Sequence, residues 1–176
     1  MIIKRIEEFK LTAAQHRKIS WLLQQCFSVY PHQQSFYKQL PSFRYLVYQQ
    51  KQLTAHLAII HRLIKVNGKN FTIFGVSDFC VHPDFRRKKI ASELLQTVET
   101  LGKKYAIDFI VLIAQEQNVY KKNGYQSCDN DCRWLIINEL QALGVAKRTL
   151  ENALMVKPLG QEKWEKGTVD FLGCLF

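Results

Sequence analysis

Four consecutive cationic residues stand between an apolar run and an amphipathic segment, at Arg86, Arg87, Lys88 and Lys89. Apolar residues recur at three- and four-residue spacing over residues 88–104, a pattern that predicts a helix. The first N–H groups of a helix have no partner within it and carry the positive end of its dipole, so a phosphate placed there gains hydrogen bonds and favourable charge. The pattern therefore predicts an anion-binding turn. A solvated turn before an ordinary helix would carry the same charges, and charge alone does not decide between the two.

Two strands are expected to flank this turn and helix. One runs through residues 71–81 and ends before Pro83. The other is the apolar run of residues 108–114, which is typical of a short strand buried on both faces, and a short polar helix is expected near residues 117–123. Strand, helix and strand in this order form a βαβ unit with a parallel crossover.

Antiparallel strands are expected before and after that unit. Residues 43–66 carry alternating β-branched and aromatic residues that predict two strands, and Asn67-Gly68 then predicts a two-residue hairpin. Near the start of the chain, Thr12 is expected to cap an amphipathic helix, and residues 33–40 favour a second short helix. Later strands are expected at residues 133–138, 153–156 and 169–176, after a polar loop at residues 128–132. These elements predict a mixed α/β sheet.

The composition indicates a globular protein of the cytoplasm. Hydrophobic residues make up 47% of the chain, and no apolar run approaches a signal peptide or the roughly 18 residues of a membrane span. Five cysteines form an odd set, so we expect free thiols, and the Cys128-x-x-x-Cys132 pair lacks the further ligands of a metal site. The net charge of +10 favours anionic partners without naming one.

The basic turn lies within a longer pattern that resembles the coenzyme A motif of the GNAT acetyltransferases. That motif reads Val-x-Pro-x-Tyr-Arg-Gly-x-Gly-Ile-Gly-x-x-Leu-Leu, and residues 81–95 read Val-x-Pro-x-Phe-Arg-Arg-Lys-Lys-Ile-Ala-Ser-x-Leu-Leu. Arg86 and Ala91 match the motif, whereas Arg87 and Lys89 stand where glycines are usual. These departures leave the strength of coenzyme binding open.

A second pattern follows in the order expected of the family. Residues 118–125 are similar to the family segment Asn-x-x-Ala-x-x-x-Tyr-x-x-x-Gly-Phe, with Tyr120, Gly124 and Tyr125 in the matching tail. Two motifs on their expected elements are more specific than either alone. The resemblance implies the GNAT-type α/β fold, with a mixed, mostly antiparallel sheet, a central splayed parallel pair and flanking helices, in one domain over residues 1–176.

The resemblance also implies an activity and a site. An enzyme of this kind would transfer an acetyl group from acetyl-CoA directly to a primary amine of a small molecule, while a backbone N–H near Cys80 and Val81 polarises the thioester carbonyl. Tyr120 matches the general-acid position, and a phenol with a pKa of about 10 is protonated at pH 7. The expected cofactor-binding residues are Phe79, Cys80, Val81, Arg86, Arg87, Lys88, Lys89, Ile90, Ala91, Ser92, Asn118 and Tyr120.

The general base is harder to assign. Asp78 is the nearest carboxylate, but it is offset by one position from the usual family location, which Ser77 occupies, and such an offset turns a side chain to the other face. A water chain relayed by Ser77 is the alternative. Cys80 lies beside the expected thioester, where packing is the expected role rather than nucleophilic attack. His56 and His61 lie in the second strand run, where they are expected to be half-buried unless one of them lines an acceptor pocket.

Two further classes stay open from the residues alone. The basic residues could form a phosphate patch on a nucleic-acid-binding protein, although no such motif accompanies them, or the fold could bind acyl-CoA without catalysis. The C-terminal segment faintly resembles the aminoglycoside 2′-N-acetyltransferase branch, but a chain of net charge +10 suits a polycationic acceptor poorly. Acceptor residues are expected within residues 26–39 and 127–133. The oligomeric state is open, and a homodimer is compatible with the sequence.

Overall fold

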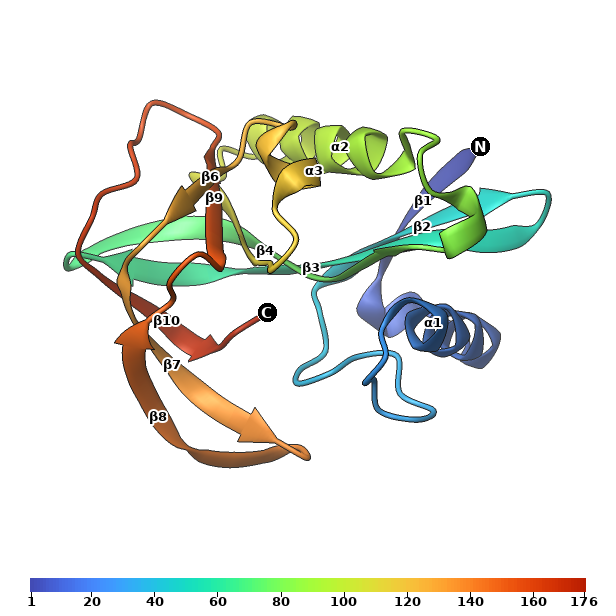
Figure 1. Ribbon diagram of the computed structural model, residues 1–176, viewed down its shortest axis with the longest axis horizontal. Coiled ribbons are helices and arrows are strands. Elements are labelled where there is room, and N and C mark those ends of the chain that lie inside the picture. The colour runs from blue at the N-terminus through green and yellow to red at the C-terminus, as the bar shows by residue number, and fades with distance from the viewer.

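A ten-stranded mixed sheet forms the centre of the computed structural model, which describes residues 1–176 (Figure 1). The helices are α1 (Ala13–Cys26), α2 (Ile90–Lys104) and α3 (Asn118–Lys121), with 3-10 turns at Glu8–Lys10 and Pro83–Phe85. The strands are β1 (Ile2–Glu7), β2 (Phe43–Gln49), β3 (Gln52–Val66), β4 (Lys69–Val81), β5 (Phe109–Ile113), β6 (Gln126–Cys128), β7 (Asp131–Asn138), β8 (Gln141–Thr149), β9 (Leu154–Pro158) and β10 (Thr168–Cys174).

The strand order is β6-β9-β5-β4-β3-β10-β7-β8, with β2 also paired to β3 and β1 paired to β2. Only β4 with β5 and β10 with β7 run parallel, and every other pair is antiparallel. Helices α2 and α3 lie on one side of the central strands and α1 lies on the other (Figure 1). The predicted fold, a mostly antiparallel sheet with a central parallel pair and flanking helices, is confirmed.

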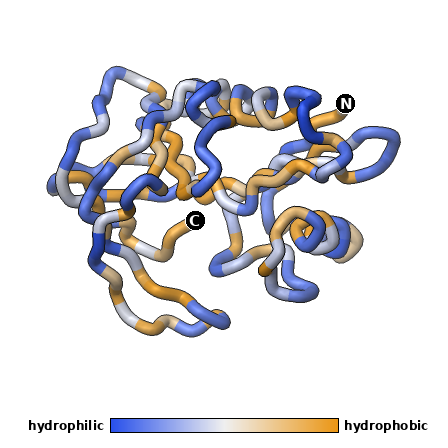
Figure 2. Tube along the Cα trace, viewed as in Figure 1, coloured by the Kyte–Doolittle hydropathy of each residue, from blue (hydrophilic) through white to orange (hydrophobic).

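Local sequence signals account for the elements next to the site. The Thr12 side chain and the Gln15 side chain cap the start of α1 reciprocally, as predicted for Thr12. The β3–β4 hairpin turns at Asn67 and Gly68, whose φ angles of 48° and 84° are the positive values that such a turn requires. Helix α2 buries Ile90, Leu94, Leu95 and Val98 against the sheet. Hydrophobic residues accordingly gather along the central strands, whereas the connecting loops are mostly hydrophilic (Figure 2).

The parallel pair separates before β4 ends. Residues 73–76 of β4 pair with residues 109–112 of β5, and β4 then continues to Val81 without that neighbour. On its other side β4 stays paired with β3 as far as Val81. The last residues of β4 therefore have one side free of strand pairing, next to the start of α2 and to α3.

Two expectations about secondary structure were wrong, and one strand was missed. Residues 33–40 form turns and bends instead of a helix, because Gln33 has a φ of 61° and the Ser35 carbonyl accepts a bond from Arg44 rather than from a later N–H group. Strands β6 and β7 occupy most of the polar loop expected at residues 128–132. Strand β8 was not predicted, because its mixed and largely exposed residues carry no clear alternation and are held by pairing to β7.

No helix is long and apolar enough to cross a membrane. The five cysteines are all free thiols, and no cluster of side chains has the make-up of a metal site.

Candidate active site

The basic turn and the start of α2 enclose a cavity of about 280 Å³. Most of the residues that the sequence assigned to the coenzyme meet here, joined by Phe85 and Val119, which the sequence did not single out. The lining residues are Val81, Phe85, Arg86, Arg87, Lys89, Ile90, Ala91, Ser92 and Val119. The cavity thus joins the free end of β4, the turn, the first turn of α2 and α3.

The backbone of this turn explains why glycines are usual in its motif. Arg87 and Lys89 each have a φ of 62°, in the left-handed region that glycine adopts without steric cost. In this conformation the N–H groups of residues 87–92 make no hydrogen bond within the protein, and the first backbone bond of the helix runs from the Glu93 N–H to the Lys89 carbonyl. A run of free N–H groups at a helix start is the geometry that binds phosphate.

The four cations do not act alike. The Arg86 Nε donates to the Val81 carbonyl oxygen at 3.2 Å, which ties the turn to the end of β4. The Lys88 ammonium lies over the Phe85 ring at 4.8 Å and does not line the cavity. Arg87 and Lys89 line the cavity, are exposed and pair with no carboxylate. These two side chains therefore add positive charge around the free N–H groups of the turn.

A β-bulge shapes the free end of β4. Ala58 pairs with Ser77 and His56 pairs with Cys80, so one residue of β3 faces two residues of β4, Asp78 and Phe79. Asp78 has a φ of 48°, which marks the bulge. The extra residue shifts by one position the order in which side chains of β4 face the two sides of the sheet. The expectation that a one-residue offset would turn Asp78 away from the reaction therefore does not apply, because it assumed a regular strand.

The Asp78 carboxyl group points to the α1 side of the sheet. Burial raises its pKa to about 6, although the neighbouring Tyr30 phenol and the Arg44 and Lys38 cations oppose the shift. The Tyr30 hydroxyl is buried beside this carboxyl group, and no acceptor meets the full distance and angle requirements of a hydrogen bond with it. A carboxyl group with a pKa near 6 can accept a proton at neutral pH.

Tyr120 lies on the opposite side of β4, on α3. Its ring packs at 6.2 Å from the Phe79 ring and at 5.8 Å from the Tyr125 ring. Burial, with a smaller effect from Cys80, raises the Tyr120 pKa to about 12, so the phenol is protonated at neutral pH. The Asp78 carboxyl group and the Tyr120 phenol thus lie on opposite sides of β4, next to the bulge.

The other residues expected at the site differ in their placement. Cys80 is only 7% exposed, and the neighbouring Cys26 thiol together with burial raises its pKa, which fits packing rather than nucleophilic attack. The His82 N–H donates to the Thr54 carbonyl on β3, so alternation turns the Val81 N–H toward the side that β5 has left. Asn118 is exposed at the first position of α3 and does not line the cavity of the turn.

A second cavity, of about 420 Å³, opens on the side of Asp78. It lies between the segment that follows α1 and the tip of the β7–β8 hairpin, and Tyr30 and Lys38 are among its lining residues. Both residues act on the pKa of Asp78, which places this cavity next to that carboxyl group. One wall lies within residues 26–39, a segment in which acceptor residues are expected, whereas the other wall, residues 137–140, lies outside the second expected segment, residues 127–133.

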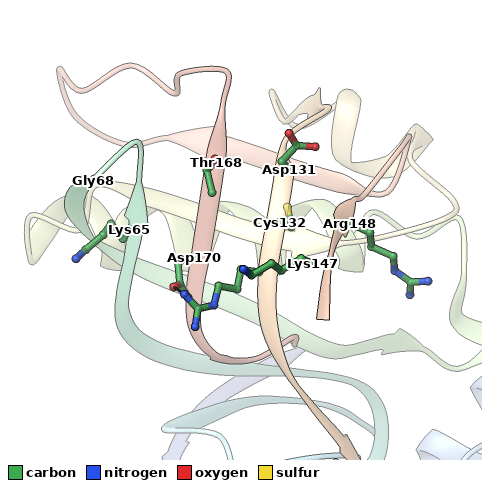
Figure 3. A pocket seen from close by; sticks show the side chains of 9 residues that line it. Lys65, Gly68, Asp131, Cys132, Lys147, Arg148, Thr168 and Asp170 are labelled. Atoms are coloured by element: carbon green, nitrogen blue, oxygen red, sulfur yellow. Dashed lines mark ion pairs between the residues drawn. The ribbon is translucent and has the colours of Figure 1, made fainter. Parts of the chain in front are cut away.

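A larger open cavity, of about 570 Å³, lies on the far part of the sheet (Figure 3). A charged row crosses four paired strands there, in the order Lys65, Asp170, Arg133 and Lys147. Arg133 and Asp170 form an ion pair at 3.6 Å. Neither the turn of residues 86–92 nor the Asp78 bulge borders this cavity, so it lies apart from both.

A splayed parallel pair that ends beside a helix start with free N–H groups is the arrangement expected of the acyl-CoA-dependent N-acyltransferases. A family model described as an acetyltransferase (GNAT) domain matches residues 9–128. The chain therefore belongs to the GNAT acetyltransferase family, whose typical co-substrate is acetyl-CoA. The resemblance read from the two motifs is confirmed at the level of the family.

Solved structures share this fold at low sequence identity. YhbS from Escherichia coli, a GNAT-family N-acetyltransferase solved in complex with CoA, has a TM-score of 0.66 and 15% identity, over 96% of this chain and 88% of its own. Eis1 from Mycobacterium abscessus has a TM-score of 0.62 and 16% identity, over 76% of this chain and 34% of its own. The ribosomal-protein-S18-alanine N-acetyltransferase from Escherichia coli has a TM-score of 0.57 and 12% identity, over 93% of this chain and 100% of its own.

The chain spans about a third of the length of Eis1 and of a GCN5-related N-acetyltransferase from Anabaena variabilis. A search among curated proteins finds no match to the sequence. Nothing in these similarities supports the aminoglycoside 2′ branch that the C-terminal segment faintly resembles.

Proposed function

We propose that this protein transfers the acetyl group of acetyl-CoA to the primary amine of a small molecule, and that residues 1–176 act as one domain. The observation that carries the proposal is the run of free N–H groups over residues 87–92, placed beside the end of β4 that β5 has left. The pyrophosphate of the coenzyme would bind to these groups and to the Arg87 and Lys89 side chains. The acyl arm would then run along the free side of β4 toward Phe79 and Val81.

The two sides of β4 divide the chemistry. On the cavity side of residues 29–38 and 137–140, the amine would give a proton to Asp78 as its nitrogen bonds to the thioester carbon. The Val81 N–H would stabilise the charge that develops on the carbonyl oxygen. On the α3 side, Tyr120 would give a proton to the sulfur as the carbon–sulfur bond breaks. Exchange with solvent would then restore both groups.

The size and lining of the acceptor cavity support a small amine. A volume of about 420 Å³ lies within the range of small-molecule sites, roughly 300–1,000 Å³. The Tyr30 and Tyr37 rings lie 6.1 Å apart along it, and aromatic faces attract ammonium groups. Glu139 at its rim would add a further attraction for a cation, whereas Lys38 would disfavour a second positive charge deep inside.

Calorimetric titration with acetyl-CoA tests the coenzyme site. The double variant Arg87→Gly/Lys89→Gly keeps a backbone that favours positive φ but removes both charges. We expect the Kd for acetyl-CoA to rise on the order of tenfold, and the difference from the native protein to shrink in high salt. The matched control is Lys51→Gly, because Lys51 is an exposed lysine with a φ of 67° in the β2–β3 turn, and it should leave the Kd unchanged.

An amine screen tests the acceptor, with thiol release and the mass of the product as readouts. Acetylation of small primary amines supports the proposal. Turnover only on a protein N-terminus would show that the acceptor is a protein and not a small molecule. Absence of acetyl-CoA binding together with salt-dependent binding of nucleic acid would overturn the proposed function.

A further inference from the structure

A buried guanidinium lies directly beneath the acyl-transfer site. Arg44 on β2 has no exposed surface, and its Nε and Nη2 bind the Glu8 carboxylate at 2.5 and 2.8 Å. Glu8 belongs to the 3-10 turn after β1 and is itself 9% exposed. Neither residue carries a motif, and neither lines the coenzyme or the acceptor cavity.

The remaining Arg44 donors connect this pair to the β-bulge through His56. Arg44 Nη1 lies 3.0 Å from His56 Nε2, and His56 Nδ1 lies 2.8 Å from the Asp78 carbonyl oxygen. Because a guanidinium only donates, Nε2 must accept, and the ring proton must therefore sit on Nδ1 and point to the Asp78 carbonyl. Burial and the Arg44 charge lower the His56 pKa to about 3, so the ring is neutral. The expectation of a half-buried strand histidine was wrong, since His56 is completely buried.

The same guanidinium also holds the first wall of the acceptor cavity. Arg44 Nη1 donates to the Ser35 carbonyl oxygen at 2.6 Å, within the segment between α1 and β2. Ser35 is 5% exposed, and its hydroxyl lies 2.8 Å from His16 Nδ1 on α1. One side chain thus fixes both the peptide that forms the bulge and the segment that faces the acceptor.

We propose that Arg44 and His56 are positioning residues for acetyl transfer, which set the Asp78–Phe79 bulge and the acceptor segment at a fixed separation. This inference rests on the proposed function of the bulge. Asp78 holds a left-handed backbone conformation, which has an energetic cost in a residue other than glycine. The bond from His56 Nδ1 to the Asp78 carbonyl offsets part of that cost and fixes the orientation of the peptide. A displacement of about 1 Å at such a peptide can cost on the order of a hundredfold in rate.

The test compares two substitutions of His56. His56→Asn places an amide N–H where Nδ1 stands and keeps the donor to the Asp78 carbonyl, whereas His56→Leu fills a similar volume without a donor. We expect kcat to fall on the order of tenfold to a hundredfold in His56→Leu and to stay within about threefold of the native value in His56→Asn. The Kd for acetyl-CoA should change by less than about threefold in both, because the phosphates bind at the separate turn.

The matched control is Thr54→Val, two residues earlier on β3 and equally buried. The Thr54 hydroxyl donates to the Val47 carbonyl and belongs to neither cavity, so the kcat of this variant should equal that of the native protein. Equal losses of kcat in Thr54→Val, His56→Asn and His56→Leu would show a general packing effect and overturn the proposal.

Nitrogen-15 NMR of the histidine rings tests the network without any turnover. We expect a His56 ring protonated on Nδ1 only, which stays neutral between about pH 5 and pH 8. The amide signals of Phe79 and Cys80 should shift in His56→Leu and stay in place in Thr54→Val. An Nε2-protonated ring, or titration near the ordinary value, would overturn the proposal. If the native protein binds acetyl-CoA but acetylates no amine, the proposed function is wrong. The NMR results would still show whether the hydrogen bonds between Arg44, His56 and Asp78 exist.

Discussion

The coenzyme turn and the acceptor side of the molecule are built in opposite ways. The turn uses consecutive residues between β4 and α2, and the groups proposed to bind the coenzyme are backbone N–H groups without partners in the protein. The proposed acceptor side brings together Glu8, the segment after α1, the bulge on β4 and the tip of the β7–β8 hairpin, and buried polar side chains join the first three of these. The first region depends on local conformation, and the second depends on the completed fold.

Because of this difference, the two regions should respond differently to amino-acid substitutions. A backbone site loses affinity gradually when a side chain changes, because its N–H groups remain. A site made from distant segments loses several contacts at once, because removal of one partner in a buried polar network leaves the other partners unpaired. The coenzyme turn should therefore accept substitutions that the acceptor side does not.

The largest expected effect is at the acceptor side. Asp78→Asn keeps the size of the side chain but removes the base, so we expect kcat/KM at pH 8 to fall on the order of a hundredfold to a thousandfold. Steady-state assays with the best amine of the screen measure this. The Kd for acetyl-CoA serves as the control and should not change. A fall in kcat/KM of less than about fivefold would show that another group is the base, with water relayed by Ser77 as the next candidate.

Tyr120→Phe should have the next largest effect. Loss of the proton donor should lower kcat on the order of tenfold to a hundredfold, while the packing against Phe79 and Tyr125 and the binding of acetyl-CoA are retained. Stopped-flow detection of thiol release measures the change. Unaltered kcat would show that the thiolate leaves without help from this phenol.

The pH profile sharpens the assignment of Asp78. With a pKa of about 6 in the native protein, kcat/KM should fall about tenfold for each pH unit below that value, because the protonated carboxyl group cannot accept a proton. The limb near pH 6 should be absent in Asp78→Asn. A limb that persists in this variant would belong to another group.

Stability should change in the direction opposite to activity at the same position. The native chain holds the Asp78 proton more tightly than the unfolded chain does, so the contribution of this group to the free energy of unfolding is lost as the pH rises from about 4 to about 6. Asp78→Asn removes the buried charge and should raise the free energy of unfolding at pH 8 by about 1–3 kcal/mol. Urea unfolding at pH 4 and pH 8 measures the difference, which should be smaller at pH 4.

The smallest effect is expected in the coenzyme turn. Lys89→Gly replaces a lysine with a φ of 62° and should raise the free energy of unfolding by up to about 1 kcal/mol, because glycine adopts this conformation without strain. Thermal unfolding of the variant measures it. A loss of more than about 1 kcal/mol would show that the Lys89 side chain makes a contact that stabilises the free protein.

The same contrast explains how far the sequence predicts the structure. Residues 81–95 carry their geometry locally, so the motif indicated the turn, the start of α2 and the cations that line the cavity. Thr12 and Asn67-Gly68 also act through neighbouring residues, and both predictions hold. The bulge at Asp78 could not be predicted, because it depends on the pairing of β3 with β4 and gives no periodicity of its own.

The partners of Asp78 were missed for a related reason. Arg44 and Glu8 stand 36 positions apart, and arginine and glutamate are seldom fully buried, so neither residue is an obvious partner for Asp78. Tyr30 lies within residues 26–39, where acceptor residues are expected, but no sequence pattern distinguishes it from its neighbours. A charged residue at an inward position of a strand, as Arg44 is, was the one available signal of a buried polar network.

The position of β10 between β3 and β7 sets an order of assembly during synthesis. The β7–β8 hairpin joins the sheet only through β10, whereas β4, α2 and β5 precede it in the chain. On the ribosome, the coenzyme turn can therefore form while residues 137–140 still have no support. The nascent chain would acquire a place for acetyl-CoA before it acquires a place for the amine, and the second wall would close only once residues 168–174 have emerged.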